Sequence, residues 1–194
     1  MCLSCAMLAG TLPTASAAEY SAGFEPVVMA AEARATHTVT NQSQLETALK
    51  DARNDDVIQL GADIVTRVGT DVPLVIGANI TIDGAGHSLS LATAGIVLEA
   101  DATIQNLKLG QTNMVRNAIL ANGHTLTLDN VQTATREGRG EFHLFCGSLT
   151  GAEGSGYTNK STGGEGKIIL KNNSSGFAAI YAGNYCDNFG SYGD

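Results

Sequence analysis

The sequence is poor in several residue types on which other protein classes depend. It contains no Trp and only 3 Pro, and charged residues make up 15% of its 194 positions. The 11 Lys and Arg residues form no cluster and the formal net charge is −8, which argues against a nucleic-acid partner. Hydrophobic residues reach 43% and Gly occurs 23 times, so the chain is too apolar for a disordered tail. These proportions favour one folded domain made of strands and tight turns.

A long hydrophobic run is also missing, so no segment is expected to span a membrane. The chain is uncharged over residues 1–17, where an apolar run over 2–12 is followed by small residues at 15–17. This order is typical of the hydrophobic core and cleavage site of a secretory signal peptide, although the usual basic start is missing. We therefore expect a signal peptide with an incomplete start at 1–17 and a linker at 18–36, in a secreted or cell-surface protein. The alternative is a buried N-terminal segment.

Cysteine is scarce. Of the 4 Cys residues, two lie within the expected signal peptide, which leaves Cys146 and Cys186 in the exported chain. These two are candidates for a disulfide in an oxidising compartment, and the alternative is a pair of small, half-buried side chains. His143 alone does not complete a metal-ligand set with them. The sequence therefore predicts no metal site, and it contains no motif for a cofactor.

One amphipathic helix is expected near the start of the folded region. Ser43 and Glu46 match a capping box, in which the first residue caps the helix and the acid three residues later returns a hydrogen bond. Apolar residues recur at helical spacing, at Leu45, Ala48, Leu49 and Ala52. The helix is predicted over residues 43–53.

After the helix the pattern changes to short alternating strands separated by Gly, Asn and Asp turns. A central apolar residue recurs 22, 22, 24, 21 and 21 residues apart, at Leu60, Ile82, Ile104, Leu128, Leu149 and Leu170. A strand-rich period of about 21–24 residues is typical of one coil of a parallel β-helix, because each coil stacks on the one before it. We therefore predict an all-β solenoid over residues 37–132, with the helix covering the open end of its first coil.

The remainder, residues 133–194, is richer in Gly and follows a looser repeat. Segments 144–149 and 180–185 resemble each other at a distance of 36 residues. This region is expected to continue the stack with longer loops or to form a separate small sheet, and the pattern leaves both open. Its last residues contain no capping element, which is compatible with a fragment of a longer array that has further domains.

Two segments resemble a known family. Both are similar to the start of pectate-lyase-like β-helix proteins. The first covers residues 39–60, with a Val-Thr-Asn start and a Val-Ile-Gln-Leu strand, and the second covers residues 80–89, with Ile-Thr-Ile-Asp-Gly. The similarity is greatest to adhesin-like, right-handed parallel β-helix surface proteins of bacteria and covers about residues 37–132. It implies a right-handed solenoid with a non-catalytic function in binding carbohydrate or a host or cell-surface protein.

The same resemblance raises the alternative of a polysaccharide lyase or glycoside hydrolase, whose sites contain grouped Asp residues. Asp83 and Asp129 follow the same strand position two coils apart, roughly 9–10 Å at a rise of about 4.8 Å per coil, close to the carboxyl separation of inverting hydrolases. The coil between them carries Gln105, however, and Asp is an ordinary turn former. His87 begins a strand after a Gly-rich corner. We therefore predict no catalytic residues, with Asp83, Asp129 and His87 as the alternative set.

Aromatic residues collect towards the C-terminal end and form the candidate binding surface. They are Phe145, Tyr157, Tyr181, Tyr185 and Tyr192. For Phe145 and Tyr181 the alternative is a pair of stacked core aromatics. The absence of a cluster of Asp residues favours two hypotheses, an exported adhesin-like module and a structural spacer of a larger surface protein, over an enzyme. The adhesin-like module is the predicted function, and the other two remain alternatives.

Overall fold

The computed structural model describes residues 34–66, 73–91, 95–111, 117–133, 135–136, 139–140, 142–148 and 164–182. The chain divides into residues 1–32 and 33–194, and the described residues all belong to the second unit. The expected signal peptide therefore lies outside the described residues, as do Leu149, Tyr157, Tyr185, Cys186 and Tyr192.

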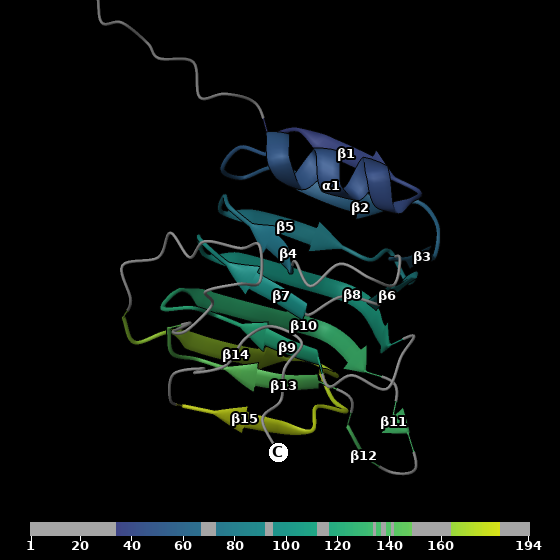
Figure 1. Cartoon of the computed structure of the whole chain (residues 1–194). Coiled ribbons are helices and arrows are strands. Elements are labelled where there is room, and N and C mark those ends of the chain that lie inside the picture. The colour runs from purple at the N-terminus through teal and green to yellow at the C-terminus, as the bar shows by residue number, and fades with distance from the viewer. Residues whose placement is uncertain are drawn as a thin grey trace, which may run out of the picture. The chain divides into compact units, whose positions relative to one another are not determined.

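The described chain forms a right-handed parallel β-helix, in which strands pair in parallel with their counterparts on the next coil (Figure 1). The main strands of the first sheet, in spatial order, are β1 (Thr36–Val39), β2 (Val57–Leu60), β5 (Ile80–Asp83), β8 (Ala102–Gln111), β10 (Thr125–Thr133) and β14 (Lys167–Lys171). Two short strands, β3 (Ile64–Val65) and β6 (Ser88–Leu91), continue this sheet around a corner, where β6 pairs with the second half of β8. The fold class predicted from the repeat is confirmed.

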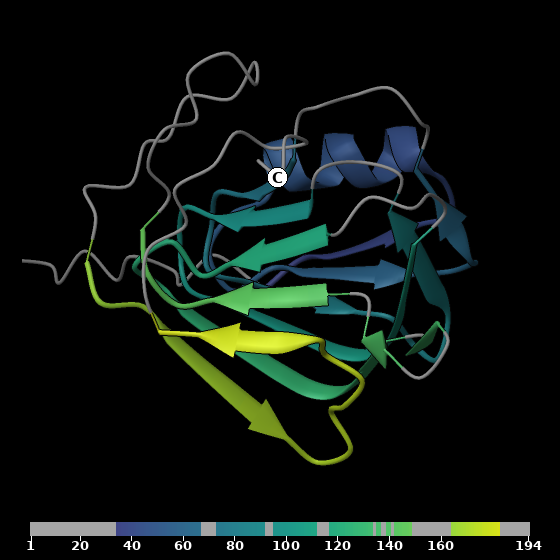
Figure 2. The same ribbon diagram turned by 60° about the horizontal axis from the view of Figure 1, so that its bottom comes forward.

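A second sheet closes each coil on another side (Figure 2). Its strands, in spatial order, are β4 (Leu74–Ile76), β7 (Gly95–Leu98), β9 (Asn117–Leu120), β13 (Phe142–Phe145) and β15 (Ala179–Tyr181). Only β11 (Thr135–Arg136) and β12 (Arg139–Gly140) pair in the antiparallel sense among the described strands.

Inward side chains form apolar rows along the stack. Successive residues of a strand point to opposite faces, so every second residue enters the core. One row of the first sheet is at most 3% exposed, and its members are Ile58, Ile82, Ile104 and Leu128. The matching row of the second sheet is Leu74, Ile96, Ile119 and Leu144. Burial of these rows, at about 25 cal/mol per Å² of apolar surface, is the main interaction that holds successive coils together.

The register of the first sheet differs from the predicted one in two places. Ile82 pairs with Ile58 and not with Leu60, so the first interval of the repeat was wrong by two residues. Both Ile58 and Leu60 are buried, and an alternating pattern alone cannot distinguish two inward positions on one strand. Leu128 pairs directly with Leu170, so the coil predicted around Leu149 supplies no strand between β10 and β14.

The looser C-terminal repeat does correspond to a strand pairing. Leu144 of β13 pairs with Ile180 of β15, and Phe145 pairs with Tyr181. The described strands after residue 140 thus add in parallel to the two existing sheets, with β14 joining β10 and β13 joining β9.

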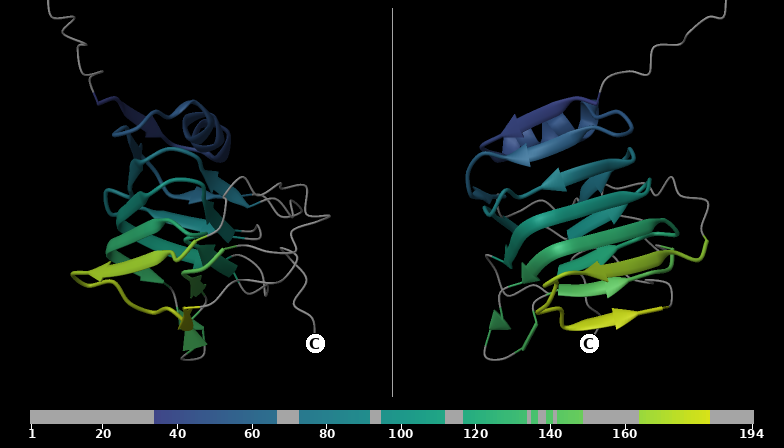
Figure 3. Two further views of the ribbon diagram at one scale, coloured as in Figure 1. Left: turned by 90° about the vertical axis from the view of Figure 1, so that its left-hand side faces the viewer. Right: turned by 180° about the vertical axis from the view of Figure 1, so that it is seen from behind.

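Helix α1 (Gln42–Asp51) lies across one end of the stack (Figure 3). Its residues Leu45, Ala48 and Leu49 are buried, and the helix packs against β1, β2 and β4. A cavity of only about 10 Å³ remains beneath it, at the lower limit for one water, so the packing is close. The described part of the chain holds no helix with the length and hydropathy needed to cross a bilayer.

The cap of this helix corrects one prediction. Asn41, not Ser43, is the N-cap, and its side chain accepts a hydrogen bond of 3.0 Å from the backbone N of Gln44. The Gln44 side chain in turn accepts from the backbone N of Thr40 at 2.8 Å. Asn caps a helix as well as Ser does, and the sequence contains both signals two residues apart. The helix therefore begins before the predicted residue.

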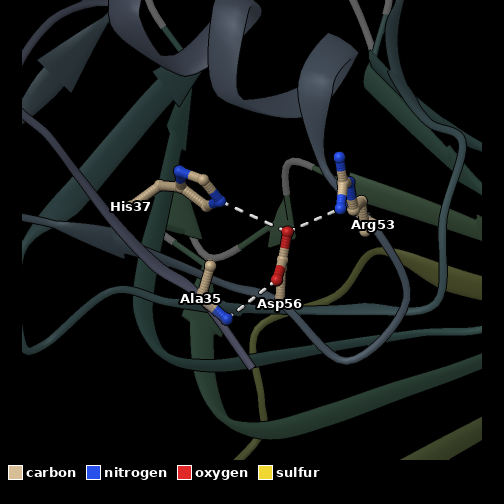
Figure 4. Close-up of polar contacts among 4 residues, drawn as sticks. All are labelled: Ala35, His37, Arg53 and Asp56. Atoms are coloured by element: carbon tan, nitrogen blue, oxygen red, sulfur yellow. Dashed lines mark hydrogen bonds and ion pairs between the residues drawn. The ribbon is translucent and has the colours of Figure 1, made fainter. Parts of the chain in front are cut away.

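Asp56 ties the first strand to the turn after α1 (Figure 4). One carboxylate oxygen accepts from the backbone N of Ala35 at 2.9 Å, and the other accepts from the backbone N of Arg53 at 2.9 Å and faces Nε2 of His37 at 3.2 Å. These hydrogen bonds, with that of Arg53 the strongest influence, lower the pKa of Asp56 below its usual value of 3.8. The residue is 5% exposed, so a charged carboxylate is held here by its donors.

Candidate functional site

A polar groove follows the corner between the first sheet and its continuation. Its volume is about 450 Å³, within the range of ligand sites. The lining residues come from three successive coils and are Asp83, Ala85, Gly86, Asn106, Leu107, Lys108, Asn130 and Gln132. Because equivalent residues of successive coils lie about 4.8 Å apart, the groove presents similar groups at a regular spacing along the stack.

At the groove, β8 and β10 bend from the main part of the first sheet into its continuation, and their pairing is interrupted there. The bend residues Asn106 and Asn130 have φ angles of +50° and +56°, in the left-handed region. Asn is among the few non-Gly residues that adopt this conformation readily, because its short polar side chain bonds locally. Asn172, at the end of β14, repeats the conformation with a φ angle of +49°.

The amide side chains at this corner form a hydrogen-bonded ladder along the stack. Asn130 Nδ2 donates to Asn106 Oδ1 at 3.1 Å, and Asn106 Nδ2 donates to Asp83 Oδ1 at 3.3 Å. Beyond the groove, Asn172 donates to Asp129. Asn106 and Asn130 are exposed, so hydrogen-bonding capacity remains for a ligand after the ladder is formed.

Asp83 accepts hydrogen bonds from three donors. Its Oδ1 accepts from the backbone N of Ala85 at 2.8 Å and from Asn106, and its Oδ2 accepts from Gln105 Nε2 at 2.9 Å. Partial burial acts to raise the pKa of Asp83, but these hydrogen bonds together lower it below 3.8. The residue is therefore a carboxylate at neutral pH and not a proton donor.

The alternative catalytic residues are only partly brought together. Asp83 and Asp129 do occupy one column, and Gln105 lies between them in the register. Asp83 lines the groove, whereas Asp129 and His87 are not among its lining residues. His87 directly follows the lining residue Gly86, and its Nδ1 atom lies 3.5 Å from Asp63 Oδ1.

The predicted aromatic surface is described at Phe145 and Tyr181. Their rings stack with centroids 4.6 Å apart and an interplanar angle of 10°, and the His143 ring lies 5.7 Å from that of Tyr181. The stack ends a row of the second sheet that begins with Val75 and continues through Val97 and Leu120, both of which are fully buried. Tyr181 is 42% exposed, so the alternative of a core aromatic is wrong for this residue.

The predicted disulfide stays a prediction. Cys146 is half-buried directly after β13, and its expected partner Cys186 lies outside the described residues. Among the residues that the structure describes, no group of three or more His, Cys, Asp or Glu is arranged to hold a metal ion.

Sequence reasoning missed the groove residues Asn106, Lys108, Asn130 and Gln132. A signal was present, since a polar residue followed by Asn occurs at 105–106, 129–130 and 171–172. It was interpreted as ordinary turn chemistry, which is correct for the backbone. That these side chains line one groove follows only from the register between coils.

A comparison with protein-family models matches residues 36–139 to a family described as "Putative pectate lyase-like adhesive domain". The match covers more than half of the chain, and it includes α1 and every residue that lines the groove. Tyr181 lies beyond it. No curated protein and no solved structure matches the chain significantly.

Proposed function

Because the chain belongs to the pectate lyase-like adhesive domain family, we propose that it is an adhesin-like protein, secreted or displayed at the cell surface, that binds carbohydrate without cleaving it. The uncharged, apolar start of the chain is consistent with export. A stack of paired coils suits this function, because it presents side chains on a rigid surface that needs no ordering upon binding.

The observation that carries the proposal is the polar groove. A carboxylate and three amide side chains from three coils, those of Asp83, Asn106, Asn130 and Gln132, line one continuous depression. Amide groups both donate and accept hydrogen bonds, and carboxylates accept them, which is the combination that the hydroxyl groups of a sugar require. The regular spacing of the groups along the stack favours a ligand that is itself a repeating polymer.

The state of Asp83 favours binding over hydrolysis. A glycosidase needs one carboxylic acid with a raised pKa to protonate the leaving oxygen. Asp83 has a lowered pKa, and all of its described partners are donors that stabilise the charged form. The contacts of Asp83 suit an acceptor of hydrogen bonds from a hydroxyl-rich ligand and do not suit the proton-donor role of the alternative mechanism.

A glycan array probed with the full chain tests the proposal. We expect the chain to bind a subset of the glycans. The double substitution Asn106→Gly with Asn130→Gly should reduce the affinity for them about tenfold, the scale expected for the loss of two hydrogen bonds. Gly keeps the left-handed backbone while it removes the amide. Asn172→Gly is the matched control, since Asn172 has the same conformation but does not line the groove. Equal binding by the double variant and the control would refute the groove as the binding site.

The enzymatic alternative is tested with the same protein. Incubation with pectic and neutral polysaccharides should release neither unsaturated sugars, seen by ultraviolet absorbance, nor new reducing ends. Product formation that Asp83→Asn or Asp129→Asn abolishes would establish a lyase or hydrolase in place of an adhesin.

Surface display is tested separately from binding. Intact cells that express the full chain are treated with an added protease, and the protein should be degraded or found in the medium. Full protection in intact cells, with degradation only after lysis, would contradict the proposed location.

A further inference from the structure

The charges of the groove narrow the class of carbohydrate that it accepts. Only two of its lining residues, Asp83 and Lys108, carry charge at neutral pH, and their charges are opposite. The remaining lining side chains are amides, apolar groups or Gly. The groove therefore offers a ligand no excess of positive charge.

The two charges lie on different walls of the groove. Asp83 belongs to the column of the first sheet that continues through Gln105, whereas Lys108 belongs to the column around the corner that continues from Ser88 to Gln132. A ligand that runs along the stack passes one cation and one anion, and otherwise meets amide groups.

An acidic sugar polymer carries one carboxylate on each unit, so several of its charges would enter the groove together. Lys108 offers one attractive partner, while Asp83, whose carboxyl stays ionised, repels. The chain as a whole adds further repulsion, because its formal net charge is −8. Neutral sugars avoid the repulsion from Asp83 and the repulsion from the net charge of the chain. They still form hydrogen bonds with the donors and acceptors that line the groove.

We propose that the groove is selective for a neutral oligosaccharide laid along the stack and that it disfavours polyuronates of equal length. The proposal rests on the proposed function of the groove as a carbohydrate site. Across the three coils that line it, the groove spans roughly 10 Å, at a rise of about 4.8 Å per coil. This length suits a short run of sugar units.

The test compares three hexamers by calorimetry with the full chain near physiological salt: β-1,4-linked glucose and mannose as neutral probes, and α-1,4-linked galacturonate as the anionic probe. We expect at least one neutral hexamer to bind about tenfold more tightly than the galacturonate hexamer. Asp83→Asn should strengthen binding of the galacturonate hexamer about fivefold, the order expected for one unit charge a few ångströms away in water. The same substitution should not strengthen binding of the neutral hexamers, because an uncharged ligand gains nothing from removal of the carboxylate charge.

Asp129→Asn is the matched control, since Asp129 occupies the same column one position beyond Gln105 but does not line the groove. It should change the affinity for the galacturonate hexamer less than Asp83→Asn does and leave the affinities for the neutral hexamers unchanged, and circular dichroism should show both variants folded. Tighter binding of the galacturonate hexamer to the unmodified chain, lost in Lys108→Gln, would overturn the neutral-sugar selectivity and leave the proposed function intact. A failure of all three hexamers and of the glycan array would instead reject the proposed function, and the selectivity with it.

Discussion

Asp63 lies one coil before His87, with its Oδ1 atom 3.5 Å from His87 Nδ1 and 2.8 Å from the backbone N of Ser88. The carboxylate thus binds the first backbone amide of the next coil's strand β6. The hydrogen bond from Ser88 is the largest influence on the pKa of Asp63, and it lowers that pKa below 3.8.

The arrangement recurs at another corner. Asp101 Oδ1 lies 3.9 Å from His124 Nδ1 and accepts from the backbone N of Thr125 at 2.8 Å. In both corners the His follows a Gly, and the Asp precedes it by about one coil. His87 and His124 therefore share the same local contact with an Asp of the preceding coil, which a catalytic role at His87 alone would not explain.

Acid is expected to destabilise the fold. Asp56 and Asp63 have lowered pKa values in the folded protein, chiefly because the backbone amides of Arg53 and Ser88 donate to their carboxylates. Such groups stabilise the fold above their unfolded-state pKa of about 3.8, and the contribution is lost as the pH falls through the folded-state value. Urea unfolding at a series of pH values should show a free energy of unfolding that declines below about pH 4. Asp56→Asn should flatten this decline, and an equally steep decline in that variant would contradict the assignment.

Removal of a cap side chain should cost stability. Leu45 is fully buried between α1 and the first coil, so Leu45→Ala is expected to lower the free energy of unfolding by about 2–5 kcal/mol and to promote aggregation through the uncovered end. Lys50→Ala, on the exposed side of the same helix, should change it by less than about 0.5 kcal/mol. Urea titration and light scattering measure both effects. Similar stabilities for the two variants would show that the helix does not cap the stack.

A β-branched side chain at the bend residue Asn106 should lower the stability of the fold. Its φ angle of +50° is strained for such residues, so Asn106→Val is expected to cost about 1–3 kcal/mol. Asn106→Gly should cost less than Asn106→Val, because Gly adopts the conformation without strain. Thermal unfolding of the two variants measures the difference, and a Val variant as stable as the Gly variant would exclude the left-handed bend.

The close approach of two strands should exclude any side chain at Gly95. A Cβ atom there would lie 2.0 Å from the carbonyl oxygen of Ala118, and the φ angle of Gly95 is +128°. Gly95→Ala should therefore destabilise the protein by several kcal/mol, or prevent its folding. Gly77→Ala is the control, since its nearest contact would be Glu99 at 4.0 Å. Soluble yield and melting temperature of the two variants measure the difference. A Gly95→Ala variant as stable as the unmodified chain would show that β7 and β9 lie further apart than in the structure.

Tyr181 is expected to be a second sugar contact. Its exposed ring offers an apolar face with a polar hydroxyl, as aromatic residues at binding surfaces commonly do. Tyr181→Ala should weaken binding to a glycan-coated surface several-fold, whereas Tyr181→Phe should retain most of it. Melting temperatures of both variants should stay near that of the unmodified chain. Unchanged binding by Tyr181→Ala would restrict recognition to the groove.

Much of the architecture could be predicted from local patterns. The predicted Val-Ile-Gln-Leu strand is β2, and the recurring residues Ile82, Ile104 and Leu128 lie in β5, β8 and β10, because alternation of inward and outward side chains is visible within a few residues. The helix cap was displaced to Asn41, and the partner of Ile82 was placed at Leu60 in place of Ile58. Both errors are shifts of two residues, because the sequence offers two similar caps in one case and two inward-facing residues in the other. Only contacts with the rest of the chain distinguish the members of each pair.

The sequence by itself determined that this chain is a stacked β-solenoid with a helix at its start, because the short-range alternation and the period near 22 residues are properties of the chain taken in order. Only the tertiary structure decided the register, the groove and the exposure of Tyr181. Asp83, Asn106 and Asn130 are far apart in sequence, and each alone is an ordinary turn residue. They become one site because the length of each coil brings them into hydrogen-bonding distance along a single corner.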